Sequence, residues 1–505
     1  MRNPKLSCSE LIEFETERPQ KGGNVIAWEE SAAKPRGGSL LKEKHPKWVQ
    51  RLEYQGNGGM CSDLNTHNIN KHKVERATMC NKNYKSVKLG VLGEFKNGAN
   101  FPKGSYGKGD KIVNVKDLFR GRYINENELD ELLPKTLKNI ESYQVEHGDI
   151  LFTRSSLVRS GAGMCAMIYK PTTRIIFCGF IIRFRLNNKN IYPLYLLYLL
   201  RSPAYRQLFT GNQQTNITNI NHDSLSSIPV SIPINKDGSF DYNKQIQIIR
   251  ILDALDDKIA LNRRINDKLE AMAKRLYDYW FVQFDFPDEN GRPYKSSGGE
   301  MVWNETLKRE IPAGWEVKPL KQFASYRTDT TKSENAYNYV STDNMLPDKQ
   351  GISDETIYPA SGNIFQYKQN DILISNIRPY FKKIWFASHC GTCSTDIICI
   401  YSNQRQHNCY IYRTIWRDDF FDYVMQGAKG SKMPRGDKEH IMNYPICCHN
   451  YLTNVLLKIF NDKCMAIQEM LFRNNNATTR LAALRDRLLP LLMNGQVVVE
   501  GEERE

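Results

Sequence analysis

One stretch of this sequence occurs twice, and the duplication limits the possible folds more than any other feature. An Asp-Ile-Leu core begins at Asp149 and again at Asp371. Two further matches follow in the same order, and the offsets of 222, 216 and 212 residues drift in one direction, as expected of a duplication with small deletions. The matched pairs are 147–154 with 369–376, 225–230 with 441–446, and 269–276 with 481–488.

Within each unit the sequence favours mixed α and β structure. Short runs rich in β-branched and aromatic residues, such as 150–152 and 180–184, are typical of strands. Residues 193–208 instead have apolar side chains at helical spacing. We therefore expect an α+β fold with two mixed α/β units, separated by two long helices.

Each unit ends in a long helix with one apolar seam. Seam residues recur at alternating steps of four and three, the a/d pattern of a helix that packs along another helix. The first seam contains Ile248, Leu252, Leu255, Ile259, Leu269 and Leu276. The second seam is predicted to contain Phe460, Ile467, Met470, Leu481, Leu484 and Leu488.

If the two helices pack antiparallel, they form a coiled coil with the units in a pseudo-twofold arrangement. About 35 residues at ~1.5 Å each predict a rod of roughly 50 Å. Asn262 and Asn266 in one seam and Asn474 in the other are expected to fix the register. The alternative is an ordinary bundle whose length carries no meaning.

Changes in composition place the domain boundaries. Residues 1–83 contain repeated Gly-Gly pairs and no sustained apolar period, so we expect them to be disordered or to precede the true start at Met60 or Met79. The predicted segments are an extension (1–83), a first unit (84–240), a central helix (241–286), a linker (287–311), a second unit (312–450), a C-terminal helix (451–495) and an acidic tail (496–505).

The charge and the apolar runs narrow the partners and the compartment. A net charge of +14 favours a polyanionic partner such as nucleic acid, although a protein can also be basic without one. The sequence contains neither an apolar run of the ~20 residues needed for a membrane span nor the apolar core of a secretory signal. We therefore expect a cytoplasmic protein whose 12 cysteines are mostly reduced.

Candidate catalytic and metal motifs are weak. The sequence lacks an Asn-Pro-Pro-Tyr methyltransferase motif, a phosphate-binding Gly-rich loop and a convincing nuclease acid-x-Lys pattern. A zinc site from Cys390, Cys393 and His389 with the later Cys447 and Cys448 is conceivable, but adjacent cysteines have the wrong spacing. We expect no enzyme activity and no bound metal, the alternative being a self-contained DNA nuclease or methyltransferase.

Four segments together resemble the specificity (S) subunit of a type I restriction–modification enzyme. They are the repeated Asp-Ile-Leu motif, the run 245–286 ending in DYWFVQFDF, the segment 311–317 (IPAGWEV) and the segment 484–495 (LRDRLLPLLMNG). The likeness covers about residues 84–497, whereas residues 1–83 have no place in the pattern. The resemblance implies two target recognition domains that each read half of a split double-stranded DNA target. It also implies a non-catalytic subunit that docks methyltransferase (M) and restriction (R) subunits, which carry S-adenosylmethionine, ATP and Mg.

Candidate DNA contacts cluster after equivalent motifs in both units. Lys, Arg and hydroxyl side chains can bind phosphates, and Arg, Lys, Asn and Gln can read base edges. In the first unit we predict Lys96, Lys103, Lys108, Arg154, Ser155, Arg159, Gln213, Gln214 and Asn216. In the second unit we predict Ser375, Asn376, Arg378, Lys382, Lys383, Lys429, Lys432 and Arg435. Because the two sets differ, we expect an asymmetric target; any single residue among them can equally be a solvated surface charge.

Overall fold

The computed structural model describes residues 83–102, 104–133, 137, 139–156, 161–210, 218–353, 356–430, 432–449 and 452–497. The predicted extension, apart from Asn83, and the chain from residue 498 onward lie outside these residues. Among the described residues, the chain splits into two compact units. The first unit contains 83–260 and 478–497, and the second unit contains 261–477. Each unit is described by itself.

The first unit is built from antiparallel sheets with one parallel pair. Its main sheet has the strand order β2-β9-β5-β7, with β2 at Gly93–Asn97, β9 at Ile181–Leu186, β5 at Ile150–Thr153 and β7 at Cys165–Met167. A second sheet has the order β4-β3-β8, with β4 at Asp130–Leu132, β3 at Tyr106–Val113 and β8 at Ile175–Phe177. Two small pairs complete it: β1 (Tyr84–Lys88) with β11 (Pro229–Pro233), and β6 (Ser155–Ser156) with β10 (Thr218–Asn219).

The second unit has a similar main sheet, but all of its pairs of named strands are antiparallel. Its main sheet has the order β15-β21-β18-β19, with β15 at Ala324–Tyr326, β21 at Ile397–Ser402, β18 at Ile372–Ser375 and β19 at Ile384–Phe386. A second sheet has the order β16-β17-β20, with β16 at Thr330–Lys332, β17 at Asn363–Tyr367 and β20 at Gly391–Cys393. In addition, β14 (Trp315–Pro319) pairs with β22 (Pro445–His449). Three helices follow the main sheet in each unit: α2 (Pro193–Arg201), α3 (Pro203–Thr210) and α4 (His222–Ser226), then α6 (Asn408–Ile415), α7 (Asp418–Gln426) and α8 (Lys438–Met442).

The first three residues of β5 and of β18 are apolar because each of these strands separates two cores. In β5, Ile150 and Phe152 belong to one buried cluster, whereas Leu151 between them belongs to another. In β18, Ile372 and Leu373 divide between two clusters in the same way. Successive side chains of a strand point to opposite faces, so a strand covered on both faces needs a continuous apolar run. This requirement explains why the Asp-Ile-Leu motif occurs in both copies.

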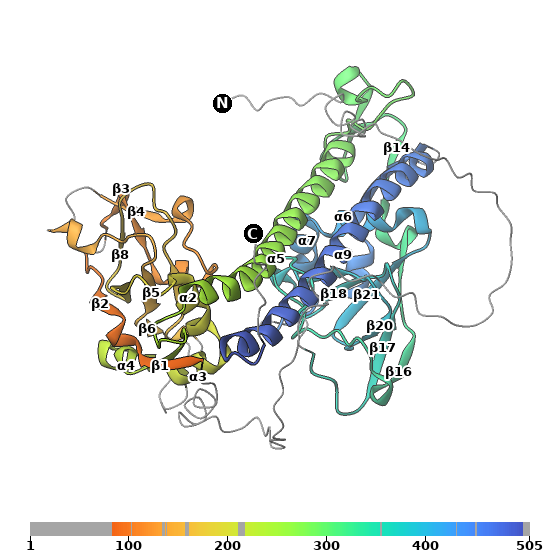
Figure 1. Cartoon of the computed structure of the whole chain (residues 1–505). Coiled ribbons are helices and arrows are strands. Elements are labelled where there is room, and N and C mark those ends of the chain that lie inside the picture. Colours follow the sequence, from red (N-terminus) through yellow and green to blue (C-terminus); the bar gives the residue numbers. More distant parts are fainter. Residues whose placement is uncertain are drawn as a thin grey trace, which may run out of the picture. The chain divides into compact units, whose positions relative to one another are not determined.

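The two long helices are shared by both units and pair antiparallel within each (Figure 1). Helix α5 spans Tyr242–Tyr277 and continues into a π-helical turn at Asp278–Val282, and α9 spans Leu452–Met493. In the second unit Asn266 Oδ1 accepts a hydrogen bond from Asn474 Nδ2 at 2.9 Å, so two of the three predicted seam asparagines meet. In the first unit Asp256 and Arg485 form an ion pair at 2.8 Å. The α+β class is therefore confirmed, and the pseudo-twofold arrangement stays a prediction.

Of the residues predicted for the α5 seam, Leu276 is half-buried and the other five are buried, whereas two of those predicted for α9 are exposed. Met470 is 49% exposed and Leu484 is 36% exposed, whereas Leu471 and Cys464 are buried. The predicted positions Phe460, Ile467 and Leu488 are buried as expected, and Leu481 packs against the first unit's core. Cys464 and Leu471 thus lie four positions after Phe460 and Ile467, not three. The error arises because α9 carries a second apolar stripe on its outer face, which contains Met470.

The segment predicted as a linker, 287–311, is not a plain connection. It contains most of a β-hairpin in which β12 (Met301–Asn304) pairs with β13 (Arg309–Pro312). Ile311 is buried in the core of the second unit. The Gly- and Ser-rich turn that suggested a linker precedes this hairpin. None of the described helices is both long and apolar enough to span a bilayer.

Candidate nucleic-acid interface

The aspartate of each repeated motif caps the turn that leads into the central strand. Asp149 Oδ2 accepts the backbone N–H of Glu146 at 2.7 Å, and Asp371 Oδ2 accepts that of Lys368, also at 2.7 Å. Both carboxylates are almost fully buried. The recurring aspartate therefore holds the start of the strand in place and does not face a ligand.

Each of these aspartates also binds an arginine, but the two arginines come from different strands. Arg185 in β9 contacts Asp149 through Nε at 2.8 Å and Nη2 at 2.7 Å. Arg327, just after β15, contacts Asp371 through Nε at 2.5 Å and Nη2 at 2.8 Å. These hydrogen bonds raise the pKa of both arginines above the usual range. By strand register Tyr401 takes the place of Arg185, and the Arg327 guanidinium lies over its ring.

Beyond the central strand of the first unit, three segments meet through backbone hydrogen bonds. The N–H of Arg154 donates to the carbonyl of Phe180 at 2.8 Å. The N–H of Ile220 donates to the carbonyl of Arg154, also at 2.8 Å. Ser155 in turn pairs with Asn219 in the short β6–β10 ladder. We call this arrangement the three-segment frame.

The second unit contains the same three-segment frame. The N–H of Asn376 donates to the carbonyl of Asp396 at 2.9 Å, and the N–H of Gly436 donates to the carbonyl of Asn376 at 3.2 Å. Ile377 forms a β-bridge with Arg435, as Ser155 does with Asn219. The two predicted groups of the second unit, which are about fifty residues apart in sequence, are thereby brought together.

Side chains on the two frames differ although the backbones correspond. Arg154 is exposed, whereas its counterpart Asn376 is half-buried. Phe180 is 63% exposed, whereas its counterpart Asp396 pairs with Arg435 at 3.1 Å. Equivalent positions thus present an apolar ring in one unit and an acid–arginine pair in the other.

Most of the predicted lysines in the second unit are held by carboxylates or carbonyls. Asp418, the first residue of α7, pairs with Lys382 at 2.7 Å and with Lys349 at 2.8 Å. These hydrogen bonds lower the pKa of Asp418 to about 2. Lys429 pairs with Asp437 at 2.7 Å, and this contact lowers the pKa of Asp437 to about 2 as well. These lysines are positioned, and their charge is partly neutralised.

The remaining predicted residues of the second unit have different surroundings. Lys383 donates to the carbonyl of Thr342 at 2.6 Å, and Lys432 is exposed. Arg378 is exposed and has a left-handed backbone with φ of +50°. Ser375 is buried and its hydroxyl donates to a backbone carbonyl two residues on, so its predicted DNA contact is corrected to a role in shaping the turn.

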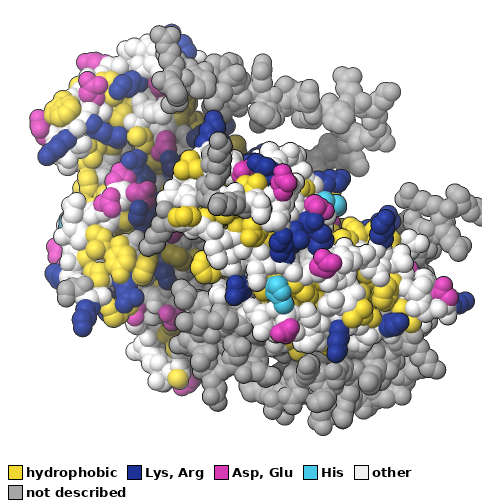
Figure 2. Space-filling view, turned by 90° about the vertical axis from the view of Figure 1, so that its left-hand side faces the viewer, with side chains coloured by type: hydrophobic (Ala, Val, Ile, Leu, Met, Phe, Trp, Pro, Cys, Tyr) yellow, Lys and Arg dark blue, Asp and Glu magenta, His cyan; other side chains and the backbone are white. Residues whose placement is uncertain are grey.

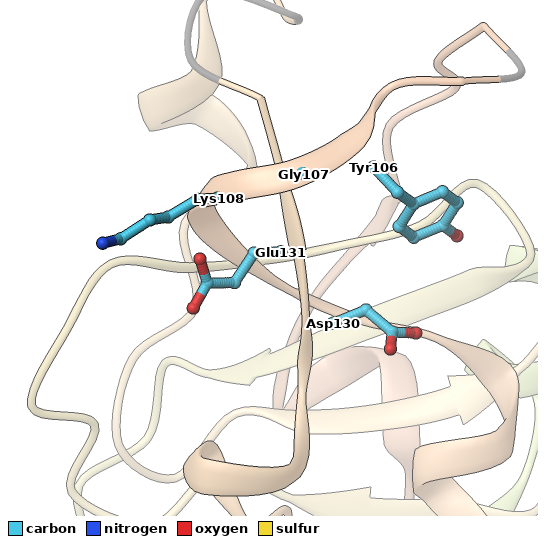
Figure 3. Close-up of a pocket in the computed structure, with 5 residues that line it drawn as sticks. All are labelled: Tyr106, Gly107, Lys108, Asp130 and Glu131. Atoms are coloured by element: carbon cyan, nitrogen blue, oxygen red, sulfur yellow. The ribbon is translucent and has the colours of Figure 1, made fainter. Parts of the chain in front are cut away.

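Lys96 and Lys108 of the first unit lie away from its frame on other strands. Lys96 in β2 lies over the Tyr143 ring at 5.4 Å. Lys108 in β3 lines a shallow hollow with Asp130 and Glu131 (Figure 3). Those two carboxylates make the hollow unfavourable for a phosphate. The predicted contacts Lys103, Arg159, Gln213, Gln214 and Asn216 lie outside the described residues.

Charge alone does not locate the interface. On the face drawn in Figure 2, Lys and Arg side chains are interspersed with Asp and Glu and form no single patch among the described residues. The described residues also contain no group of three or more His, Cys, Asp or Glu side chains that could hold a metal ion. Burial raises the pKa of Cys393 and of Cys447 to about 12, and the two thiols lie in different cores.

Residues 81–271 match the family described as the type I restriction modification DNA specificity domain. This stretch, which covers most of the first unit and most of α5, is therefore similar to a type I DNA specificity domain. It is 22% identical over 451 residues to the type I restriction enzyme HindI specificity subunit of Haemophilus influenzae, covering 76% of this chain and 94% of that protein. It is 23% identical over 280 residues to the MjaIX specificity subunit of Methanocaldococcus jannaschii, covering 51% of this chain and 59% of that protein. A solved structure of an S subunit from M. genitalium is 13% identical with a TM-score of 0.46, and the match covers 83% of this chain and 98% of that chain.

Sequence reasoning missed three residues of the frames and their surroundings. Phe180, Asp396 and Asp418 are neither basic nor amide side chains, so a search for DNA-binding residue types passes over them. A usable signal was present for two of them, because Phe180 and Asp396 are separated by the same 216-residue offset as the later matched pair. No such signal identifies Asp418, whose role depends on two lysines from distant loops.

Proposed function

We propose that this specificity subunit reads a bipartite, asymmetric double-stranded DNA target, one half with each three-segment frame. The supporting observation is that both units hold the same backbone frame while its side chains differ. A shared scaffold gives each unit the same way of approaching the duplex, and unlike side chains select unlike bases. The target is therefore expected to consist of two different sequence blocks separated by a spacer.

The outer face of α9 supports the docking of a methyltransferase subunit. Val455 is 59% exposed, Ile459 is 41% exposed and Met470 is 49% exposed, and at helical spacing all three lie on one exposed face beside the buried seam. Large apolar side chains that recur on one exposed helix face usually mark a protein interface. The proposed occupant is a helix of the M subunit, which carries S-adenosylmethionine, and the R subunit with ATP and Mg would join through that complex. The specificity subunit itself would catalyse nothing.

DNA footprinting of the complex with its methyltransferase subunit tests the reading function. We expect protection of two separated blocks. Arg154→Ala is expected to weaken contacts in one block and Arg378→Ala in the other, each lowering affinity by about 5- to 150-fold if the arginine reads a base. Protection of one continuous block would exclude a bipartite target, and catalytic turnover by the purified chain with Mg or S-adenosylmethionine would support the nuclease or methyltransferase alternative.

Matched controls exist in both units. Lys189 and Arg405 are exposed cations that lie beyond the ends of β9 and β21 opposite to the frames. A six-residue strand extends about 20 Å, so alanine at either position removes the same charge far from the frame. We expect both controls to bind DNA nearly as the wild type does. If they weaken binding as much as the frame variants, the frames are not the reading sites.

Docking is tested separately by co-purification with the methyltransferase subunit. Met470→Glu places a charge on the outer stripe and is expected to reduce complex formation without unfolding the chain. Glu469→Ala, at the neighbouring exposed position, is the control. Undiminished complex formation by Met470→Glu together with Ile459→Glu would place the M-subunit interface elsewhere.

A further inference from the structure

Arg435 differs from the other predicted cations because its backbone is fixed on both sides. Its N–H donates to the carbonyl of Lys429 and its carbonyl accepts the N–H of Lys429, each at 2.9 Å. On its other side Arg435 bridges Ile377, and the neighbouring Pro434 carbonyl accepts the N–H of Arg378 at 2.8 Å. The starting point of this side chain is therefore set by two adjoining segments.

The side chain of Arg435 is also oriented while most of it stays accessible. Its Nη2 lies 3.1 Å from Asp396 Oδ1, and the side chain is 57% exposed. Asp396 is itself anchored, because its N–H donates to Ser394 Oγ at 3.3 Å and its carbonyl accepts the N–H of Asn376. One side of the planar guanidinium is occupied, and the other donors are left for a ligand. A pre-oriented fork loses less conformational entropy on binding than a free side chain.

The chemistry of this arrangement favours a base edge over a phosphate. A phosphate contact needs only a positive charge, and the nearby lysines can provide it. A guanidinium fork held by a carboxylate instead offers two parallel N–H donors, the pattern that matches O6 and N7 of guanine in the major groove. The neighbouring carboxylate also repels a phosphate more than it repels the uncharged edge of a base.

We propose that Arg435, positioned by Asp396, reads a guanine in the half of the target bound by the second unit. The inference rests on the proposed function and assigns one base type to one residue. Asp396 is a positioning residue, since it acts through Arg435. The first unit has Asn219 and Phe180 at the corresponding backbone positions, so its half of the target has no guanine requirement from this pair.

The experiment uses the complex with its methyltransferase subunit and a pool of randomised duplexes, from which the wild-type target is selected. Arg435→Ala is expected to lose preference for guanine at one position of the second block, lowering affinity for the selected target by about 5- to 150-fold. Arg435→Lys keeps the charge but lacks the fork, so it should lose the same preference while retaining its salt dependence. Asp396→Asn should weaken the preference at that same position.

Replacing the assigned guanine with 7-deazaguanine removes N7 alone. This replacement should weaken binding by the wild type and have little further effect on Arg435→Ala, since the lost contact is the same. Arg405→Ala serves as the control, and preferences in the first block should be unchanged throughout. Retained guanine preference in a folded Arg435→Ala variant would overturn the inference while the two-block footprint stands. A single-block wild-type footprint would instead overturn the proposed function.

Discussion

The two units place the same buried carboxylate at the start of the same strand, but they satisfy it from different directions. In the first unit the arginine projects from β9, and in the second it follows β15, because Tyr401 occupies the other site. What both copies retain is a paired buried acid, whichever strand provides the arginine. A buried carboxylate without a partner is costly, so the pairing persists although its sequence positions do not.

The three-segment frames show the reverse relation, because their backbone geometry is the same in both units and their side chains differ. Their backbone hydrogen bonds correspond position by position, whereas Phe180 and Asp396, at the same place on the frame, have unlike chemistry. Backbone bonds do not depend on side-chain identity, so an exposed position can change without disturbing the frame. The core therefore changes its residues to keep an interaction, and the frame keeps its geometry while its surface chemistry changes.

Removing the buried carboxylate should produce the largest difference between the units. Asp371→Ala is expected to lower the free energy of unfolding of the second unit by about 3–5 kcal/mol, because it leaves the largely buried Arg327 with only the more distant carboxylate of Asp329, at 3.7 Å. Asp149→Ala should cost less, about 1–3 kcal/mol, because the Arg185 side chain is 29% exposed, against 13% for Arg327, and can be hydrated. Urea unfolding measures both values. Equal losses would show that the two ion pairs are energetically equivalent despite their different burial.

Transferring the acid–arginine pair between frames should have a smaller but more specific effect. Phe180→Asp combined with Asn219→Arg gives the first unit the residues that the second unit has at these positions. If the frames are equivalent, the double variant should acquire a guanine preference of about fivefold or more in the first block. Selection from randomised duplexes measures this gain. A stable double variant with no new preference would show that matching backbone bonds do not make the frames interchangeable.

Removing the exposed ring of Phe180 should lower DNA affinity modestly, and only for the first block. Phe180→Ala is expected to lower affinity for the first block by about 1 kcal/mol, the scale of a lost apolar contact with a thymine methyl group. No charge is removed, so the slope of affinity against salt should stay the same. Titrations at several salt concentrations check both points. An altered slope would mean that the ring affects phosphate contacts and not a base.

The smallest effect concerns pH and the lysine pair of the second unit. Asp418 has a folded pKa of about 2, below its usual value of about 3.9. Its contribution to stability is therefore complete above about pH 4 and is lost as the pH falls through about 2. Because the side chain is 63% exposed, Asp418→Asn should lower stability at pH 7 by less than about 1 kcal/mol. Urea unfolding at pH 7 and pH 2.5 should show this difference shrinking at the lower pH; an unchanged difference would exclude the ion pairs as its cause.

The seam of α9 shows where the sequence was informative and where it was not. The long helices and the strand at 150–152 were predicted from local residue type and spacing, and the repeat was predicted from three matches in the same order. The same periodicity misplaced Met470 and Leu484, because a helix with two apolar stripes satisfies two seams and spacing alone does not say which one is buried. Met470 and Leu471 are adjacent in sequence, and packing within the second unit decides that only Leu471 is buried.

The candidate site divides in a similar way. The predicted groups at 375–383 and 429–435 were chosen because they follow motifs equivalent to those of the first unit, but the sequence did not indicate that they share a β-bridge. Ser375 was included for its hydroxyl, and strand geometry turned that hydroxyl inward. The lysines were selected for their charge, although carboxylates from other segments hold Lys382 and Lys429.

The sequence by itself determined that one α/β unit occurs twice, and that each copy ends in a helix with an apolar seam. These features depend on neighbours a few residues apart, where residue type and spacing are sufficient. Only the tertiary structure decided which arginine meets each buried aspartate, which face of α9 stays exposed and that Asp396 orients Arg435. Those outcomes depend on strand register and on contacts between distant segments, and a shift of one residue would change every partner.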